Sequence, residues 1–203
     1  MSDILSLDIE TANFSYDIGG WNNRTLFEPS VIATWDGSNS TIFSKEDIEL
    51  EGVNTLPLHP RDIGDHLIDF INKGGKILGH NILKFDLPVI KDSLDCWAAG
   101  DVLSKHSESI IDTRVIVQKA ALKHQRVATD LNMLASQNLK AEKMMSSLDA
   151  PVQWQNGNYN DVAEYCLKDA QLTYDLYKHM RDYSFVKSRS LETGEIVEIE
   201  IEW

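Results

Sequence analysis

The hydrophobic pattern of the first 45 residues predicts three β-strands. Ile4–Ile9 is a short apolar run with β-branched residues, which is typical of a buried strand. Val31–Trp35 and Thr41–Ser44 flank an Asp-Gly-Ser-Asn turn sequence and predict a hairpin. The polar stretch from Thr11 to Pro29 is too long for a tight turn, so we expect a loop that crosses a surface or a site.

Helical spacing dominates the rest of the chain. Arg61–Asn72 carries apolar residues three and four positions apart, and Lys76–Gly79 is typical of another short strand. Beyond Leu83 the pattern is mainly helical, interrupted by a strand-like pair at Ile110-Ile111 and by a predicted loop from Asp149 to Asn158, where Pro, Gly and Asn gather. Three helices are predicted in this part: Thr113–Leu122, Thr129–Ser136, and one from Asn160 or Asp161 to about Met180.

The last of these helices carries two polar residues on its apolar side. Apolar residues recur at helical spacing between Val162 and Met180 and define a core-facing stripe. Asp169 lies in the middle of this stripe, and Tyr165 lies one turn earlier, about 6 Å along the axis. A phenol and a carboxylate on one inward face indicate either a polar pocket or a hydrogen bond satisfied within the core.

The final 20 residues predict a second hairpin. Two alternating runs flank the turn sequence Glu-Thr-Gly-Glu at 192–195. A two-residue Thr-Gly loop would set Arg189 opposite Glu198 and Lys187 opposite Glu200, which pairs opposite charges. The other face of this hairpin would be apolar and buried: Val186, Ile199 and Ile201. We expect a structural rather than a chemical role.

The order of these elements predicts one α/β domain, a mixed β-sheet flanked by α-helices with a C-terminal β-hairpin. A chain of 203 residues with 42% hydrophobic residues supplies one well-packed core. We expect a single domain over residues 1–203, with a catalytic core at 1–183 and the hairpin at 184–203.

Composition excludes several classes of protein. Cys96 and Cys166 establish neither a disulfide framework nor a structural zinc site. The sequence carries no signal peptide and no run near the roughly 18 apolar residues of a membrane span, so we expect a soluble, cytoplasmic protein. The formal net charge is −13, from 19 Lys and Arg against 32 Asp and Glu. That excess opposes coating of duplex nucleic acid or docking on an anionic membrane.

Two carboxylates end the first predicted strand. Asp8 and Glu10 are two residues apart, so they share one face, whereas Leu5, Leu7 and Ile9 take the other. Adjacent carboxylates repel each other unless a cation lies between them. The alternative is a solvated strand end.

A third carboxylate, Asp86, follows the Lys76–Gly79 strand and lies among apolar residues. A buried, unpaired carboxylate is costly, so a partner or a metal ion is expected. The alternative is an aspartate that only begins a helix.

Three short segments form a recognisable set. They are Ser6–Thr11 (Ser-Leu-Asp-Ile-Glu-Thr), Gly79–Asp86 (Gly-His-Asn-Ile-Leu-Lys-Phe-Asp) and Tyr165–Asp169 (Tyr-Cys-Leu-Lys-Asp). The set resembles the motifs of the DnaQ-like, ribonuclease H-like DEDD 3′→5′ exonucleases, especially the proofreading domains of family-B DNA polymerases. The third segment resembles the Tyr-x-x-x-Asp pattern of the tyrosine (DEDDy) branch. The resemblance extends from Ile4 to Met180.

This resemblance implies a ribonuclease H-like fold with four carboxylates around two divalent cations. By the family's pattern, Asp8, Glu10 and Asp169 hold one cation, Asp8 bridges to the second, and Asp86 holds that second cation. Oxygen-only ligands suit Mg²⁺ or Mn²⁺. Tyr165 would orient the attacking water, because an ordinary tyrosine pKa of about 10 makes it a poor general base at neutral pH.

The expected activity is that of a stand-alone, metal-dependent 3′→5′ exonuclease acting on single-stranded DNA or RNA ends and releasing nucleoside 5′-monophosphates. The alternatives are a non-catalytic nucleic-acid-binding or scaffold module and a metal-dependent endonuclease. All four carboxylates and Tyr165 are present, which disfavours the non-catalytic module. Any proofreading role would require a protein partner in a replication, repair or RNA-processing complex, because the chain has no room for a polymerase domain.

Further residues are weaker candidates. Asn81 is expected to hydrogen-bond within its strand-to-helix turn, although it is also a candidate substrate contact. Asp112 resembles an accessory aspartate of the superfamily and is otherwise typical of a helix N-cap. Trp21 and Trp154, in predicted polar loops, could stack on a base. The main candidate substrate contacts are Thr11, Asn81 and Phe85.

The net charge limits how much nucleic acid the protein can hold. Two divalent cations would offset only four of the thirteen negative charges. We therefore expect weak, distributive binding that is confined to the last few nucleotides of a strand.

Overall fold

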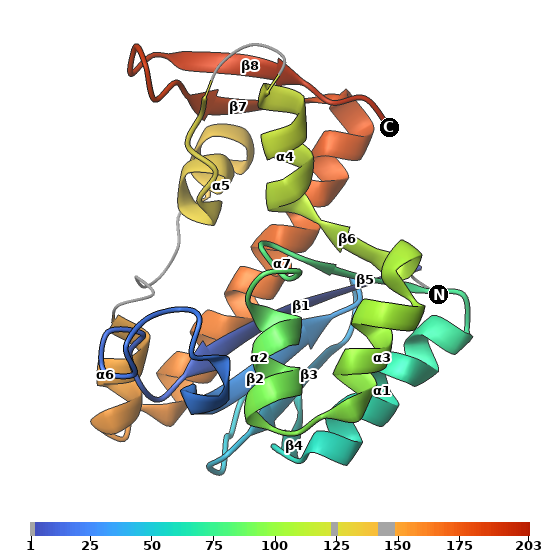
Figure 1. The fold of residues 1–203 in the computed structure, drawn as a ribbon, viewed down its shortest axis with the longest axis vertical. Helices are drawn as coiled ribbons and strands as arrows, with labels where there is room; N and C mark the ends of the chain where they lie inside the picture. The colour runs from blue at the N-terminus through green and yellow to red at the C-terminus, as the bar shows by residue number, and fades with distance from the viewer. Residues whose placement is uncertain (1–2, 123–125, 142–148) are drawn as a thin grey trace.

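A mixed six-stranded β-sheet forms the centre of the molecule, with helices on both faces (Figure 1). The computed structural model describes residues 3–122, 126–141 and 149–203. A separate antiparallel hairpin lies at the C-terminus. The predicted fold class, α/β with a mixed sheet flanked by helices and a terminal hairpin, is confirmed.

The sheet has the strand order β4-β3-β2-β1-β5-β6. Its strands are β1 (Ile4–Thr11), β2 (Pro29–Trp35), β3 (Ser40–Ser44), β4 (Asn54–Pro57), β5 (Lys76–Gly79) and β6 (Ile110–Asp112). Strand β1 is central, because it pairs antiparallel with β2 on one side and parallel with β5 on the other. The sequence pattern did not predict β4, an exposed edge strand parallel to β3.

The alternation along β1 separates two faces of the sheet. Its apolar residues Leu5, Leu7 and Ile9 pack, as predicted, against one group of helices. These helices are α1 (Pro60–Asn72), α2 (Asp86–Ser93) and α3 (Trp97–Lys105). On the opposite face, the core that includes Val31 and Ala33 of β2 is closed by α6 (Asp149–Gln155) and α7 (Tyr159–Tyr183). The carboxylates of β1 therefore lie on the α7 side.

A further apolar cluster lies beyond the end of the sheet, at the top of Figure 1. It is formed by α4 (Thr113–Ala121), α5 (Leu131–Leu139), the second half of α7, and the hairpin strands β7 (Phe185–Arg189) and β8 (Ile196–Glu200). Two 3-10 helices complete the structure, Arg24–Leu26 and Ser107–Ser109. Among the described residues, no helix combines the length and the apolar character that a membrane crossing needs.

The loop predicted for residues 149–158 is wrong, because its first part forms α6. Pro151 is the third helical residue, where a missing amide hydrogen costs nothing because first-turn amides have no intrahelical acceptor. Asp149 in the first turn also interacts favourably with the helix dipole. Gly157, with φ of +84°, ends the segment, and its amide donates to the carbonyl of Trp154.

The terminal hairpin forms, but its predicted register is wrong by two residues. Lys187 pairs with Glu198, and Arg189 pairs with Ile196. The loop is longer than the predicted Thr-Gly pair, because the hydroxyl oxygen of Ser190 accepts hydrogen bonds from two loop amides. A shift of two residues keeps every side chain on its face. The predicted apolar face is therefore buried: Val186, Ile199 and Ile201.

Candidate active site

Three carboxylates meet where β1 ends against α7. One oxygen from each of Asp8, Glu10 and Asp169 lies within 4.8 Å of the other two. The alternation of β1 directs its two acids to the side that α7 covers, and Asp169 lies on the buried stripe of α7. Glu10 and Asp169 are buried and Asp8 is half-buried. Negative charge concentrated in this way favours a cation.

Tyr165 lies one helical turn before Asp169 and is fully buried. Its hydroxyl forms a side-chain hydrogen bond with Asp169. Burial raises the pKa of this phenol strongly, and the nearby charges of Glu10, Asp169 and Asp8 raise it further. Tyr165 therefore stays protonated, so it can orient a neighbouring group by hydrogen bonding but cannot remove a proton from water.

Asp86 approaches the same region from the other side of β1. It is the first residue of α2 and only 3% exposed. Burial raises the pKa of its carboxyl to about 7, and the negative charge of Asp112 adds to the increase, while backbone hydrogen bonds at Asp86 and Ile9 partly oppose it. Asp86 thus begins a helix and also places a carboxyl group that is costly to ionise in the absence of a cation.

The turn that delivers Asp86 is held by Asp112. The carboxylate of Asp112 accepts hydrogen bonds from the amides of Asn81 and Leu83 at 3.0 and 3.2 Å. It also caps α4 by accepting from the amide of Val115 at 3.2 Å, so the predicted N-cap is confirmed. Asn81 has φ of +73°, and its carbonyl accepts from two amides later in the turn.

Gly79 is required for the close approach within this turn. A Cβ atom added to Gly79 would lie 2.5 Å from Cβ of Ile82, well inside the contact distance of two carbon atoms. Ile82 is fully buried in the core under α1, α2 and α3. The turn therefore packs tightly onto the sheet before it presents Phe85 and Asp86.

All eight residues predicted as catalytic or as main substrate contacts line one pocket of about 220 Å³. They are Asp8, Glu10, Thr11, Asn81, Phe85, Asp86, Tyr165 and Asp169. Asp86 lies outside the group of three clustered carboxylates but borders the same pocket. The first and last segments that supply these residues are more than 150 residues apart in the chain, and the fold brings them to one place.

Aromatic residues of the long loop after β1 form another wall of the pocket. Trp21 contacts Phe85 edge to face at a ring-centroid distance of 5.3 Å, and Phe14 stacks on Tyr16 at 4.7 Å. Trp21 and Tyr16 are 63% and 66% exposed, so their rings are accessible to a ligand. Of these loop residues only Trp21 was predicted as a stacking candidate, although an aromatic residue recurs every few positions between Thr11 and Pro29.

The other tryptophan proposed for stacking has a different role. Trp154 is buried on α6 and packs against Tyr159 at 4.6 Å. It does not line the pocket that holds the carboxylates. The prediction that Trp154 could stack on a base is wrong, because the segment expected to be a polar loop is a helix that packs on α7.

Two residues of the site had no assigned role in the sequence analysis. Cys166 is buried, and its thiol donates to the carbonyl oxygen of Asp8 at 3.4 Å and contacts Asp8 Oδ2 at 3.7 Å. Burial raises the pKa of this thiol, as do the charges of the surrounding carboxylates, so it remains a weak donor that positions Asp8. His80 lines the pocket, and its Nε2 donates to the carbonyl oxygen of Thr129 at 2.8 Å.

Comparisons of the chain with protein-family models and with curated proteins find no match. The geometry of the pocket and the chemistry of its residues therefore carry the functional argument.

Proposed function

We propose that this protein is a metal-dependent 3′→5′ exonuclease of the DEDDy type that acts on single-stranded nucleic acid. The observation that carries the proposal is the gathering of four carboxylates, a protonated Tyr165 and several accessible aromatic rings around one pocket. The three sequence motifs that resemble this class supply all four carboxylates and the tyrosine.

The donor set fits hard divalent cations. Asp8, Glu10 and Asp169 offer three carboxylates within binding distance of one ion, and Asp86 offers a fourth that lines the same pocket. The raised pKa of Asp86 supports this assignment, because the carboxyl group lacks a compensating positive charge. Mg²⁺ or Mn²⁺ bound here would polarise the phosphodiester and stabilise the leaving 3′-oxygen.

The protein's own groups then have distinct tasks. Tyr165 orients the attacking water by hydrogen bonding, because its high pKa prevents it from acting as a base. The Cys166 thiol contacts Oδ2 of Asp8 and helps to fix the position of this carboxylate. Asp112 maintains the turn that presents Asp86 and Phe85.

The aromatic wall supports a single-stranded substrate. The bases of a single strand are free to stack on aromatic side chains, and such stacking tolerates any base sequence. Trp21, Phe85 and Tyr16 offer ring faces and edges beside the carboxylates. This arrangement favours a strand end whose terminal base is held while its phosphodiester lies at the acids.

A labelled strand tests the proposal directly. We expect a 5′-labelled single-stranded oligonucleotide, incubated with Mg²⁺ or Mn²⁺, to shorten from its 3′ end and release nucleoside 5′-monophosphates. Asp8→Ala is expected to abolish the ladder. Asp182→Ala, which changes an exposed aspartate of the same helix α7, is the matched control and should retain it.

Three outcomes contradict the proposal. A protein that leaves both DNA and RNA intact with either metal is not this enzyme. Strand binding in EDTA without any cleavage would indicate the non-catalytic module. Cleavage of a circular single strand would indicate the endonuclease, because a strict exonuclease requires an end.

A further inference from the structure

A second pocket, of about 530 Å³, lies beside α4, away from the carboxylates. We call it the arginine pocket. One side is a face of α4, another is the segment 126–129, and the third is the hairpin loop. Its polar lining consists of Arg114, Gln118, Arg126, Thr129 and Glu192.

Hydrogen bonds hold this pocket in shape. Nε of Arg114 and Nε2 of Gln118 both donate to the hydroxyl oxygen of Thr129, at 3.2 and 3.4 Å. The segment that carries Arg126 pairs with the hairpin, since the amide of Leu191 donates to the carbonyl of Arg126 at 2.9 Å and Val127 bridges to Ser190. The two arginines therefore project from an ordered framework.

The charge of the pocket is opposite to that of the molecule. Two arginines face a single acid, Glu192, in a protein whose formal net charge is −13. Among the described residues, neither Arg114 nor Arg126 forms an ion pair. Arg126 is exposed. An anion thus finds here two guanidinium groups that form no ion pair with a described carboxylate.

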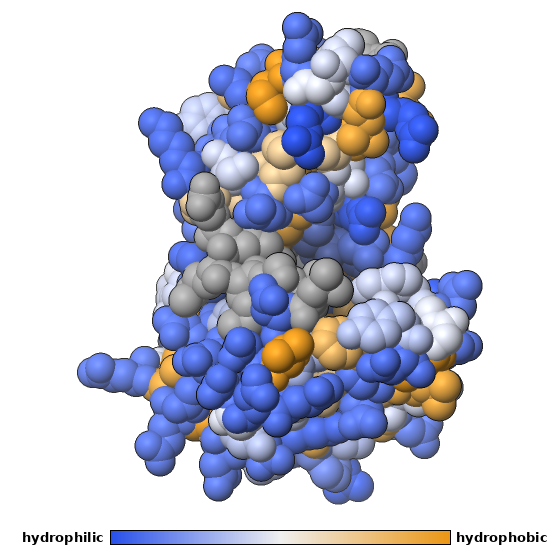
Figure 2. All heavy atoms as spheres, turned by 90° about the vertical axis from the view of Figure 1, so that its left-hand side faces the viewer, coloured by the Kyte–Doolittle hydropathy of each residue, from blue (hydrophilic) through white to orange (hydrophobic). Residues whose placement is uncertain are grey.

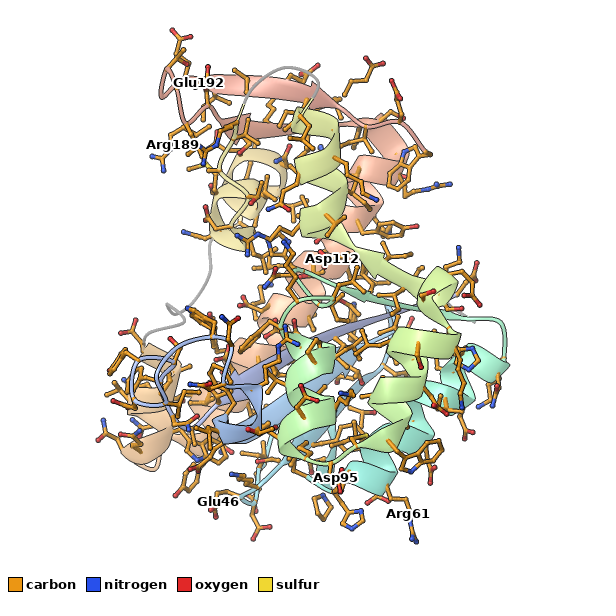
Figure 3. All side chains as sticks on the ribbon, viewed as in Figure 1. Glu46, Arg61, Asp95, Asp112, Arg189 and Glu192 are labelled. Carbon is orange, nitrogen blue, oxygen red and sulfur yellow. The ribbon has the colours of Figure 1, made fainter. Side chains whose placement is uncertain are left out.

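A hydrogen bond links the lining of the arginine pocket to that of the pocket that holds the carboxylates. His80 lines the carboxylate pocket, and its Nε2 donates at 2.8 Å to the carbonyl of Thr129, whose hydroxyl binds Arg114. Helix α4 begins after Asp112 and presents Arg114 and then Gln118 on one face. In Figure 3, Asp112 marks the residue before α4, and Glu192 marks the hairpin loop that borders the arginine pocket.

We propose that the arginine pocket binds a backbone phosphate of the same single strand whose 3′ end lies among the carboxylates. This inference rests on the proposed function and adds the route by which the strand leaves the site. Guanidinium groups bind phosphate in a bidentate manner, and a hydrogen bond between His80 and Thr129 links the lining of this pocket to that of the carboxylate pocket. The arginine pocket thereby gives the acidic protein a local positively charged binding site for a polyanion.

Binding measured without catalysis tests the route. Fluorescence anisotropy of a labelled single-stranded 12-mer, in EDTA at low salt, is expected to show at least threefold weaker binding for Arg126→Gln. The slope of log K against log salt should fall by about 0.7 for the loss of one phosphate contact. Arg126 is exposed, and an unchanged Tm confirms that the variant folds. Arg114→Gln, which also breaks a bond to Thr129, is the second variant.

Two matched substitutions sharpen the test. Glu192→Gln removes the one acid of the pocket and should strengthen binding of the 12-mer. Arg61→Gln makes the same charge change at the opposite end of the molecule (Figure 3) and should leave affinity and salt slope unchanged. If Arg126→Gln, Arg114→Gln and wild type bind the 12-mer with the same affinity and salt slope, the proposal that the arginine pocket binds the strand is overturned.

The test of the arginine pocket can fail or succeed independently of the test of exonuclease activity. Arginine-dependent binding of the 12-mer by a protein that never cleaves would support the route and contradict the exonuclease. For an active protein, the ratio of cleavage rates on a 12-mer and a dinucleotide should fall at least threefold in Arg126→Gln. If inorganic phosphate raises Tm through Arg126 while 12-mer binding is independent of it, the pocket takes a free anion and the strand route is overturned.

Discussion

Asp86 is the residue at which stability and the proposed chemistry oppose each other. In the metal-free protein, burial raises its pKa to about 7, above the ordinary value of 3.8. The folded state therefore holds a proton between these values that the unfolded state has lost. This contribution to stability is present at low pH and disappears as pH rises through 7.

Asp86→Asn should remove this pH dependence. We expect the metal-free variant to have a Tm roughly 2–8 °C above that of wild type at pH 8, with a smaller difference at pH 5. Nuclease activity should be lost, because the amide cannot replace an anionic metal ligand. Thermal unfolding in EDTA from pH 5 to 8 measures the effect, and parallel curves for the two proteins would contradict it.

Tyr165→Phe tests the orienting role of the phenol. Because the hydroxyl is bonded to Asp169 and stays protonated, its loss should lower kcat about 100-fold and leave KM within a factor of two. The pH profile should keep its shape, since Tyr165 does not titrate near neutral pH. Tyr183→Phe, at an exposed position of the same helix, is the control. A full loss of metal binding in Tyr165→Phe would instead indicate a structural role.

Residue patterns could predict the acids of the site but not the groups that support them. Asp8 and Glu10 follow from strand alternation, and Asp169 follows from helical spacing, because each pattern is local. The contact of Cys166 with Asp8 joins residues 158 positions apart, and that of His80 with Thr129 joins residues 49 apart. Such contacts exist only after the chain has folded, so no local periodicity indicates them.

At the scale of elements, the turn between β5 and α2 depends on the absence of a side chain at Gly79. Gly79→Ala would set a Cβ atom 2.5 Å from Ile82 Cβ, so the turn must move away from the core. We expect a loss of about 1–3 kcal/mol in the free energy of unfolding, measured by urea denaturation. Activity should fall as well, since Phe85 and Asp86 follow this turn.

Gly100→Ala is the matched control for this prediction. Gly100 lies within α3, where an added Cβ atom would meet only the Lys91 side chain, at 3.4 Å. Alanine favours a helix over glycine by up to about 1 kcal/mol, so this variant should be as stable as wild type or more stable. Equal losses in both variants would refute the argument for Gly79.

Elements were predictable where one periodicity ran without interruption. Strand β5 and helix α1 begin and end within one residue of their predicted bounds. Helix α6 was missed because proline, glycine and asparagine suggest a loop, whereas Pro151 lies in the first turn and Gly157 lies beyond the end. The hairpin register depended on hydrogen bonds of Ser190 within its own loop, which the alternation of β7 and β8 does not encode.

At the scale of the whole molecule, cation binding and stability should be linked. Divalent cations that bind the native carboxylates, and not the unfolded chain, stabilise the fold by mass action. We expect Mg²⁺ or Mn²⁺ at about ten times its Kd to raise Tm by roughly 2–6 °C relative to EDTA at equal ionic strength. Asp8→Asn should abolish this increase, and an unchanged increase would place the cation elsewhere.

The acidic surface limits the length of strand that the molecule can retain. Hydrophilic residues cover most of the face drawn in Figure 2, and hydrophobic residues lie there in small separate groups. Against a formal charge of −13, we propose that the aromatic wall and the arginine pocket supply attraction to a polyanion. For the proposed exonuclease, we expect this distribution to give short contact with each strand end.

Helix α7 contributes to two hydrophobic cores. We therefore expect the part of the site on α7 to open less often than the part on the loop after β1. Its residues from Val162 to Leu167 pack under the sheet, and those from Leu172 to Met180 pack with α4, α5 and the hairpin. Opening α7 requires both cores to separate, so amide exchange near Asp169 should be as slow as global unfolding. The loop that carries Tyr16 and Trp21 is largely exposed and can open at little cost. We therefore expect the half of the site on α7 to persist as long as the fold does, and the half on this loop to change shape more readily.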